Sequence, residues 1–504
     1  MTKLGSFDMR KKMMIRCWVM SLTIAGVAGS ASLADWPQFR GENSAGVVAG
    51  PTIPTEFNPG KNELWSVPVG LGHSSPCIVG DLLFLTTYDE QQRRLEVVCF
   101  SRVDGSVRWR RSVPTDKIES GHPSFNPASS TPTSDGDLVV AYFGSFGLIC
   151  FDRDGGKLWE RKMPLTKSYA GNATSPAIIG DRVILYRANH VDHFLLALDK
   201  KSGKQIWKID QAEPFASELA CTSCPIVDGE KLIVHGARSV QAFRIDTGER
   251  LWVAKCATTA TSTPVVAGGE VIVAAWNKMG EPALRPTFPS FGQLLAQHDR
   301  DQNQQIGRDE LPRIMIFHRP DGAEAPQNGA AIRFQYVDRD NDGEISKQEW
   351  GSSLLELEKF RAGYDQHGIL AIPLDSEGVV DPARIRTLAK QGIPEVPSPL
   401  CKDGLVYFVK NGGVLTCLDQ QTGERLGRIR TEGRGTHYAS PVIADGKVFS
   451  TAGDGRISVL TLGPKPKVLA VNDMGDDTYA TPAIVDGVVY VRTHSRLYAF
   501  GKAE

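Results

Sequence analysis

The sequence has almost no net charge and, after its first 34 residues, no long apolar run. Its 57 Lys and Arg residues against 58 Asp and Glu leave a formal charge of -1. No overall field therefore attracts nucleic acid or an anionic membrane surface. No later apolar stretch approaches the roughly 20 residues that a membrane-spanning helix needs. We expect neither a nucleic-acid partner nor a membrane span in the mature protein.

Cysteine is sparse and irregularly spaced, with nine in 504 residues. A chain of this size does not need a disulfide framework to stabilise its fold. Cys221 and Cys224 have the spacing of a redox or metal pair, but no second Cys or His pair completes a zinc site. This pair is open to two interpretations, a functional pair or two small buried residues at the start of a strand.

The N-terminus has the pattern of an export signal. Basic residues from Arg10 to Arg16 precede the apolar stretch Cys17 to Gly29, and Ser32-Leu33-Ala34 has the small-x-small form of a cleavage site. The alternative, a membrane anchor, requires a longer apolar stretch. We predict a signal peptide at residues 1–34 and a mature protein in the periplasm or outside the cell.

Glycine and proline are abundant, at 50 and 30 residues, and both recur in a repeated unit. In this unit a Ser, Thr or Cys precedes proline, and glycine follows four or five residues later. Each glycine then precedes an apolar stretch typical of a β-strand. The prolines are Pro76, Pro132, Pro176, Pro225, Pro264, Pro399, Pro441 and Pro482, and the glycines are Gly80, Gly136, Gly180, Gly229, Gly268, Gly404, Gly446 and Gly487.

A second repeat marks the turn before the last strand of each unit. Asp-x-x-x-Gly-x-x-x-Trp is complete at Asp199, Gly203 and Trp207, and the Gly and Trp recur in three other units. Each unit therefore has the pattern of four short antiparallel strands, with an indole that packs between neighbouring units.

Eight such units predict an all-β fold, an eight-bladed β-propeller of four-stranded antiparallel blades. The last unit has room for only three strands before Glu504, so we expect Leu64 to Val69 to supply the fourth and close the ring. The predicted propeller occupies residues 64–276 and 368–504, and residues 35–63 form an N-terminal extension.

These repeats resemble those of the pyrroloquinoline-quinone-like β-propeller superfamily, and residues 35–41 resemble the opening of many secreted bacterial members. The superfamily includes quinoprotein dehydrogenases and the propeller lipoprotein of the outer-membrane assembly machine. The resemblance therefore implies the fold and leaves the function open.

Residues 277–367 are an insertion in the fifth blade, with the pattern of a small α-helical EF-hand pair. Two twelve-residue loops, Asp299 to Glu310 and Asp338 to Glu349, place oxygen ligands as a calcium-binding loop does. A hard cation with 6 to 8 oxygen ligands requires such a loop, whose last Glu supplies two of them. The predicted ligands are Asp299, Asp301, Asn303, Gln305, Glu310, Asp338, Asp340, Asp342, Glu344 and Glu349.

The first loop departs from the pattern at its sixth position, where Gln304 replaces the usual glycine. A side chain there opposes the left-handed turn and is expected to weaken this site. Ile306 and Ile345, both at position eight, are predicted to pair across a short β-bridge. The alternative, that these acidic stretches are solvated turns, does not explain two full-length loops between helical patterns.

Polar residues before some of the first strands form a second candidate site. His73, Asn172, His437 and Tyr438 are predicted to lie around one mouth of the central channel. They could bind a ligand or metal, or they could form the polar rim of any solvated channel.

Two functions follow from these patterns. One is a non-catalytic scaffold that binds a protein or polysaccharide of the cell envelope, with calcium stabilising one loop region. The alternative is an alcohol or sugar dehydrogenase that holds pyrroloquinoline quinone in the propeller funnel. The resemblance to those dehydrogenases implies a pair of adjacent cysteines over the quinone, which this sequence lacks. We therefore favour the scaffold.

Overall fold

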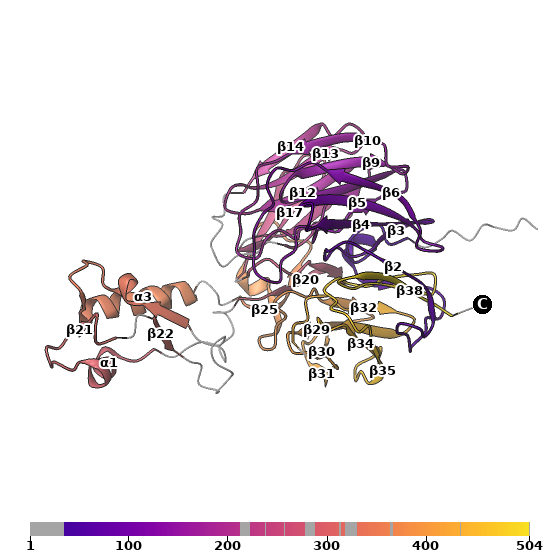
Figure 1. The fold of residues 1–504 in the computed structure, drawn as a ribbon. Helices are drawn as coiled ribbons and strands as arrows, with labels where there is room; N and C mark the ends of the chain where they lie inside the picture. Colours follow the sequence, from indigo (N-terminus) through magenta and orange to yellow (C-terminus); the bar gives the residue numbers. More distant parts are fainter. Residues whose placement is uncertain are drawn as a thin grey trace, which may run out of the picture. The chain divides into compact units, whose positions relative to one another are not determined.

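The computed structural model describes residues 35–211, 222–236, 238–256, 258–277, 288–311, 314–317, 330–362, 366–433 and 435–502 (Figure 1). The predicted signal peptide and Cys221 lie outside these residues. No helix within the described ranges is both long enough and apolar enough to cross a bilayer. Among the described cysteines, Cys77, Cys99, Cys150, Cys224, Cys401 and Cys417 are free thiols.

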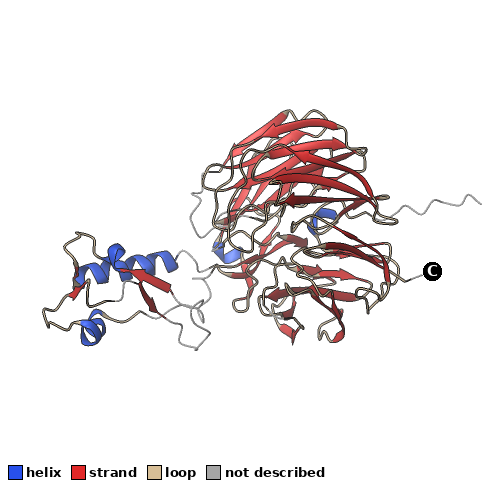
Figure 2. Ribbon diagram, viewed as in Figure 1, coloured by secondary structure: helices blue, strands red, loops and turns tan. Residues whose placement is uncertain are grey.

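Eight antiparallel sheets of the propeller follow one another along the chain and confirm the predicted blades (Figure 2). Blades one to four contain β3 (Cys77–Val79), β4 (Leu82–Asp89), β5 (Arg94–Ser101) and β6 (Val107–Val113); β7 (Thr133–Ser134), β8 (Leu138–Phe143), β9 (Gly147–Asp152) and β10 (Lys157–Lys162); β11 (Ala177–Ile179), β12 (Arg182–Ala188), β13 (His193–Asp199) and β14 (Gln205–Asp210); β15 (Ile226–Asp228), β16 (Lys231–His235), β17 (Ser239–Arg244) and β18 (Arg250–Lys255).

The second half of the ring has the same order. Blades five to eight contain β19 (Val265–Ala267), β20 (Glu270–Ala275), β25 (Gly368–Pro373) and β27 (Arg386–Ala389); β28 (Leu400–Lys402), β29 (Leu405–Lys410), β30 (Val414–Asp419) and β31 (Arg425–Arg430); β32 (Val442–Ala444), β33 (Lys447–Thr451), β34 (Arg456–Thr461) and β35 (Val468–Asp473); β36 (Ala483–Val485), β37 (Val488–Arg492) and β38 (Arg496–Phe500).

The fourth strand of the eighth blade comes from the other end of the chain. Strand β2 (Glu63–Pro68) pairs antiparallel with β38 and places Trp65 opposite Ala499. This pairing is the predicted closure, one residue earlier than the sequence indicated. It covers an edge that the last three strands would otherwise leave exposed.

Two blades have a fifth strand that the repeat did not predict. Strand β26 (Gly378–Val379) pairs parallel with β18 in the fourth blade, and β1 (Val47–Val48) pairs parallel with β32 in the seventh. Short 3₁₀ turns lie near both, η1 (Glu42–Ser44) and η3 (Pro382–Arg384). Strand β1 precedes the first repeat and β26 lies in the connection between β25 and β27 of the fifth blade, so the repeated pattern could not reveal them.

Burial follows strand position within each blade. All six residues of β8 are buried, whereas β10 buries Trp159 and exposes the residues on either side of it. A middle strand packs both faces against neighbouring blades, while an outermost strand has one solvated face. The apolar core is thus divided into layers between adjacent blades, such as that of Phe84, Trp109 and Phe151.

The repeated tryptophan packs on the turn glycine of the next blade. Trp159 donates its indole N–H to the Lys200 carbonyl at 2.8 Å. Its ring lies over Gly203, which has a φ of +67°. A Cβ on Gly203 would come within 2.6 Å of the ring, so the glycine serves both the left-handed turn and the close approach.

The insertion enters and leaves the fifth blade between two paired strands. Ala275 at the end of β20 pairs with Gly368 at the start of β25. The elements between them are α1 (Phe291–His298), β21 (Ile306–Gly307), β22 (Ile314–Phe317), β23 (Ala330–Arg333), α2 (Phe334–Val337), β24 (Glu344–Ile345) and α3 (Lys347–Ala362). They share a small core of their own, centred on Leu294, Phe334 and Trp350.

Candidate functional sites: two acidic loops and a central cavity

Each acidic loop of the insertion begins where a short helix ends. Asp299 is the C-cap of α1, and Asp338 is the C-cap of α2. Helix α1 is fixed at its other end by a capping box between Ser290 and Gln293. Strands β21 and β24 pair the two loops, with Ile306 opposite Ile345. The predicted β-bridge is confirmed.

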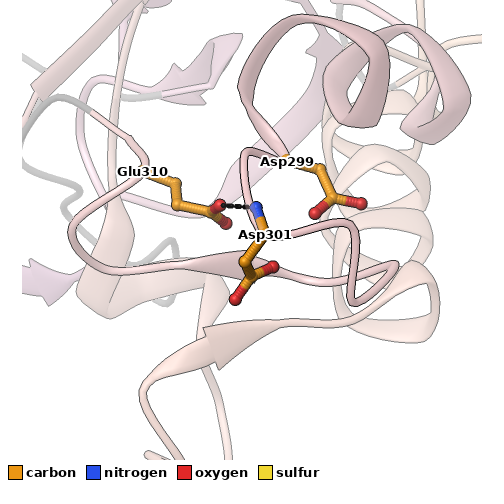
Figure 3. A group of neighbouring side chains, drawn as sticks. All are labelled: Asp299, Asp301 and Glu310. Atoms are coloured by element: carbon orange, nitrogen blue, oxygen red, sulfur yellow. Dashed lines mark hydrogen bonds between the residues drawn. The ribbon is translucent and has the colours of Figure 1, made fainter.

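Carboxylates converge within each loop. Ligand oxygens of Asp299, Asp301 and Glu310 lie within 4.8 Å of one another, and those of Asp338, Asp340 and Asp342 do the same. Figure 3 shows Glu310 approaching Asp301 from the opposite side of the first loop, with its carboxylate 3.3 Å from the Asp301 backbone nitrogen. Such clusters of hard oxygen atoms match what calcium requires.

The final Glu of each loop is held in the same way. Glu310 accepts hydrogen bonds from the backbone N–H groups of Gly307 and Arg300, and these lower its pKa. Burial raises the pKa of Glu349, but N–H donors on Ser346 and Arg339 outweigh it, and the pKa falls below its usual value. Both carboxylates are therefore kept ionised and folded back over their loops.

Gln304 adopts the conformation that a glycine would have. Its φ is +65°, and that of Gly343 at the same position of the second loop is +93°. A non-glycine residue pays about 1–2 kcal/mol for this left-handed geometry. The first loop thus keeps the shape of the second at a conformational cost.

A hydrogen bond between the side chains of Asn303 and Glu344, two further predicted ligands, connects the two loops. The Asn303 side chain accepts from the Gln305 N–H at 2.8 Å and donates to the Glu344 carboxylate at 3.2 Å. At position seven the backbone carbonyl is the ligand, so Gln305 and Glu344 would contribute main-chain oxygens.

Asp338 is the most buried of these carboxylates. It is 1% exposed, and its Oδ1 has no hydrogen-bond partner among the described residues. Arg308 lies 3.4 Å from its other oxygen. A buried anion with a bare oxygen is costly unless a cation meets it. Because Arg308 meets only one of the two oxygens, the second loop leaves a buried carboxylate oxygen that a divalent cation could bind.

A cavity of about 290 Å³ lies among residues from all eight blades of the propeller. Two residues from every blade line it, at one and three positions before the repeated proline. The inner set is Ser75, Thr131, Ser175, Cys224, Thr263, Ser398, Ser440 and Thr481, and the outer set is His73, Ser129, Ala173, Thr222, Thr261, Val396, Tyr438 and Tyr479.

The inner set forms a closed ring of hydrogen bonds, in which each backbone N–H donates to the side chain of the next blade. Thr481 closes the ring by donating to Ser75 Oγ at 3.1 Å. Six further links measure 2.9–3.0 Å, and the eighth runs from Ser175 to the Cys224 sulfur. This ring accounts for the repeated Ser/Thr-Pro pair. Without the hydroxyl of the next blade, the backbone N–H of the residue before proline would be unpaired. The proline itself has no N–H and needs no acceptor.

The N-terminal segment crosses the ring. Trp36 pairs with Ile78 of the first blade, Asn43 bonds Val227 of the fourth, and Arg40 donates to the Pro399 carbonyl beside the sixth. Phe39, in the middle of this segment, contributes to the cavity lining. Burial lowers the pKa of Arg40 to about 9.

Two of the four predicted channel-mouth residues line the cavity and two do not. His73 and Tyr438 belong to the outer set, whereas Asn172 and His437 lie outside the lining. Both stand four positions before proline, and alternation along an extended chain turns them into the blades. His437 is fully buried against Gly413 and Thr431, and Asn172 donates to Ser130.

A family model described as outer membrane protein assembly factor BamB matches residues 52–286 and 334–463, well over half of the chain. The chain belongs to this family. A curated BamB of Yersinia pestis is 26% identical over 278 residues, which span 50% of this chain and 66% of that relative, just under two thirds of its length.

Solved structures show the same fold as this BamB-family chain at low identity. BamB from Moraxella catarrhalis is 12% identical with a TM-score of 0.52, over 88% of this chain and 98% of that one. A quinohemoprotein alcohol dehydrogenase from Comamonas testosteroni is 14% identical with a TM-score of 0.52, over 95% and 82%. A europium-containing methanol dehydrogenase is 11% identical with a TM-score of 0.52, over 93% and 98%.

Aromatic residues of the cavity were missed in this BamB-family sequence. Phe39, Phe125, Tyr169, Trp276 and Tyr479 line the cavity, and none was predicted to do so. Tyr479 carried a signal, because it stands three positions before Pro482, as Tyr438 does before Pro441. The others come from loops outside the repeat and have no such register.

Proposed function

We propose that this chain is an exported, calcium-binding scaffold that engages proteins of the cell envelope and carries out no chemistry of its own. The observation that carries the scaffold role is its membership of a family described as an outer membrane assembly factor. The curated relative bears the same description. A propeller offers rigid loops and blade edges on which such partners can dock.

Calcium is the cofactor that we assign to the insertion, which we interpret as an EF-hand pair in the fifth blade. Asp338, Asp340, Asp342 and Glu349 would supply side-chain oxygens in the second loop, with the Glu344 carbonyl between them. Asp299, Asp301, Asn303, Glu310 and the Gln305 carbonyl would do so in the first. The bare buried oxygen of Asp338 is the strongest support for a cation.

Calcium titration into metal-stripped mature protein tests this assignment. We expect about two ions per chain, falling by about one in each of Asp338→Ala and Asp299→Ala. Glu377→Ala, an exposed acidic residue outside the insertion, serves as the control. Absence of heat and of any change in melting temperature would refute calcium binding.

The runner-up, a quinone-dependent dehydrogenase, does not fit the cavity. Pyrroloquinoline quinone carries three carboxyl groups, and the described residues that line the cavity include no Lys or Arg to meet them. Glu395 in the lining would repel such an anion. A quinone absorption band that persists through gel filtration would contradict this conclusion.

Partner binding tests the scaffold directly. Immobilised mature protein should retain specific proteins from solubilised envelope, and we expect chelation to reduce retention if the insertion contributes to the surface. Asp338→Ala with calcium should then behave like the wild type with chelator. If no envelope protein is retained above an immobilised control of equal size and charge, the scaffold role is wrong.

A further inference from the structure

The central cavity is partly open, rich in aromatic rings and lined by hydroxyl groups, and the proposed scaffold role does not use it. Its lining includes Phe39, Phe125, Tyr169, Trp276, Tyr438 and Tyr479. Because Phe39 belongs to the segment that crosses the ring, the cavity has side chains across the axis as well as around it. Its volume of about 290 Å³ lies at the lower end of small-ligand pockets, roughly 300–1,000 Å³.

The aromatic side chains come from several blades. His73 lies 4.9 Å from Tyr479 between ring centroids, and Tyr438 lies 5.9 Å from Tyr479. His122 and Tyr169 form a second pair at 5.5 Å. Several aromatic rings in the lining of one cavity favour a ligand with apolar faces of its own.

The hydroxyl groups offer donors. Each hydroxyl of the inner ring accepts a backbone N–H. Ser175 and Thr263 also bond the Cys224 thiol, and the other hydroxyls of the ring keep an O–H to donate. Ser124 adds another hydroxyl group to the lining. Its Oγ lies 2.8 Å from His122 Nδ1 and is hydrogen-bonded to the Tyr438 hydroxyl. A ligand that matches these groups must carry several oxygen acceptors.

The charge of the cavity argues against an anionic ligand. Burial, then Arg492 and His494, lower the pKa of His73 to about 3, so its imidazole is neutral at physiological pH. Glu395 is the one carboxylate of the described lining, and Asn411 already donates to it at 3.0 Å. An anion finds no lysine or arginine in this lining, and a cation finds a single carboxylate, one oxygen of which is bonded to Asn411.

We propose that this cavity binds a neutral sugar. A pyranose presents C–H groups on its faces, which stack on aromatic rings, and hydroxyl and ring oxygens on its edge, which meet hydroxyl donors. The tyrosine and tryptophan rings supply the first contact, and the inner ring and Ser124 supply the second. This site is independent of the calcium loops and of the protein-binding role.

Fluorescence and calorimetric titrations of the full mature chain with calcium test the proposal. The probes are glucose, N-acetylglucosamine, maltose and cellobiose, with choline and pyrroloquinoline quinone as charged comparators. We expect saturable binding of at least one sugar. Tyr479→Ala should weaken it about tenfold, the loss expected for one stacked ring, while Tyr479→Phe should retain most of it.

Tyr336→Ala, an exposed tyrosine in the insertion, is the matched control and should bind as the wild type. Asp338→Ala should lose calcium and keep the sugar, which separates this proposal from the calcium assignment. Three results would overturn it: none of the four sugars binds the wild type, a charged comparator binds more tightly than every sugar, or Tyr479→Ala retains wild-type affinity with an unchanged melting temperature.

Discussion

Gln304 and Gly343 occupy the same position in two loops of one domain, so the chain contains its own comparison. Both residues have a positive φ, but only the glutamine carries a Cβ that opposes it. A free loop can relax from this conformation, whereas a loop wrapped around calcium cannot.

We expect Gln304→Gly to tighten calcium binding at the first loop by about fivefold or more, because 1–2 kcal/mol of backbone strain is removed. The reciprocal change, Gly343→Gln, should weaken the second loop by a similar factor. Calcium titration of both variants measures the effect. Equal affinities in wild type and Gln304→Gly would show that the backbone at this position does not limit binding.

Glu119 is a buried acid whose protonation is coupled to folding. It is 5% exposed, and burial raises its pKa to about 7, against the opposing effects of the Thr166 hydroxyl and of Arg187. The folded state therefore holds this proton at pH values where the unfolded chain, with a pKa near 4.5, has lost it.

Between pH 4.5 and 7 the folded state binds more protons here than the unfolded state, so this contribution to stability is complete at pH 4.5 and lost as pH rises to 7. Glu119→Gln, which stays neutral, should melt at a higher temperature than the wild type at pH 8, and the difference should shrink at pH 5. Thermal melts at the two pH values measure this. A wild type and variant that differ equally at both pH values would contradict the raised pKa.

At the scale of the element, the contact between tryptophan and turn glycine joins one blade to the next. Gly203 and Gly180 have nearly the same φ, +67° and +60°, yet only Gly203 lies beneath an indole. A Cβ at Gly180 would meet nothing within 4 Å.

Gly180→Ala should therefore cost only the conformational penalty, about 1–2 kcal/mol. Gly203→Ala should cost about 1–3 kcal/mol more, because the new methyl group overlaps Trp159 and forces the two blades apart. Chemical denaturation of both variants measures the difference. Equal losses would mean that the blades tolerate a gap at this contact.

The elements that repeat were predictable, and those that do not were missed. The apolar stretch after each turn glycine and the Ser/Thr/Cys-Pro register identified all eight blades. The added strands β1 and β26 have two residues each, too few to show any periodicity. The cavity shows the same division, because Tyr438 lies in the repeat register while Phe39 and Trp276 come from segments whose position depends on tertiary contacts.

His437 shows why a correct repeat can still give a wrong site. His437 is the neighbour of Tyr438 in the sequence, and both lie in the segment that precedes β32. Successive side chains of an extended segment point in opposite directions, so one residue faces the cavity while its neighbour is buried in the blade.

At the scale of the whole molecule, the propeller and the insertion have separate cores. Ala275 and Gly368 are paired partners, so the two ends of the insertion leave the fifth blade side by side. Replacing residues 278–366 by a short Asn-Gly turn would convert this connection into an ordinary hairpin.

We expect the shortened chain to fold, to melt within a few degrees of the calcium-free full chain and to bind no calcium. Circular dichroism and calcium titration measure the two outcomes. The sugar titration should be unchanged, because the described cavity residues all lie outside the excised segment. A shortened chain that aggregates or loses its β-sheet signal would show that the propeller depends on the insertion.

Ring closure joins residues that are synthesised early in translation to residues that are synthesised late. Strand β2 can pair only after β38 has been synthesised. Ser75 can accept its hydrogen bond only after Thr481 has been synthesised, 406 positions later. A ribosome completes nearly the entire protein before either contact can form, and contacts of such high sequence separation form slowly. Until then the first blade cannot pack against the eighth. The propeller thus remains an open arc during most of translation and closes into a ring only when its last strand has been made.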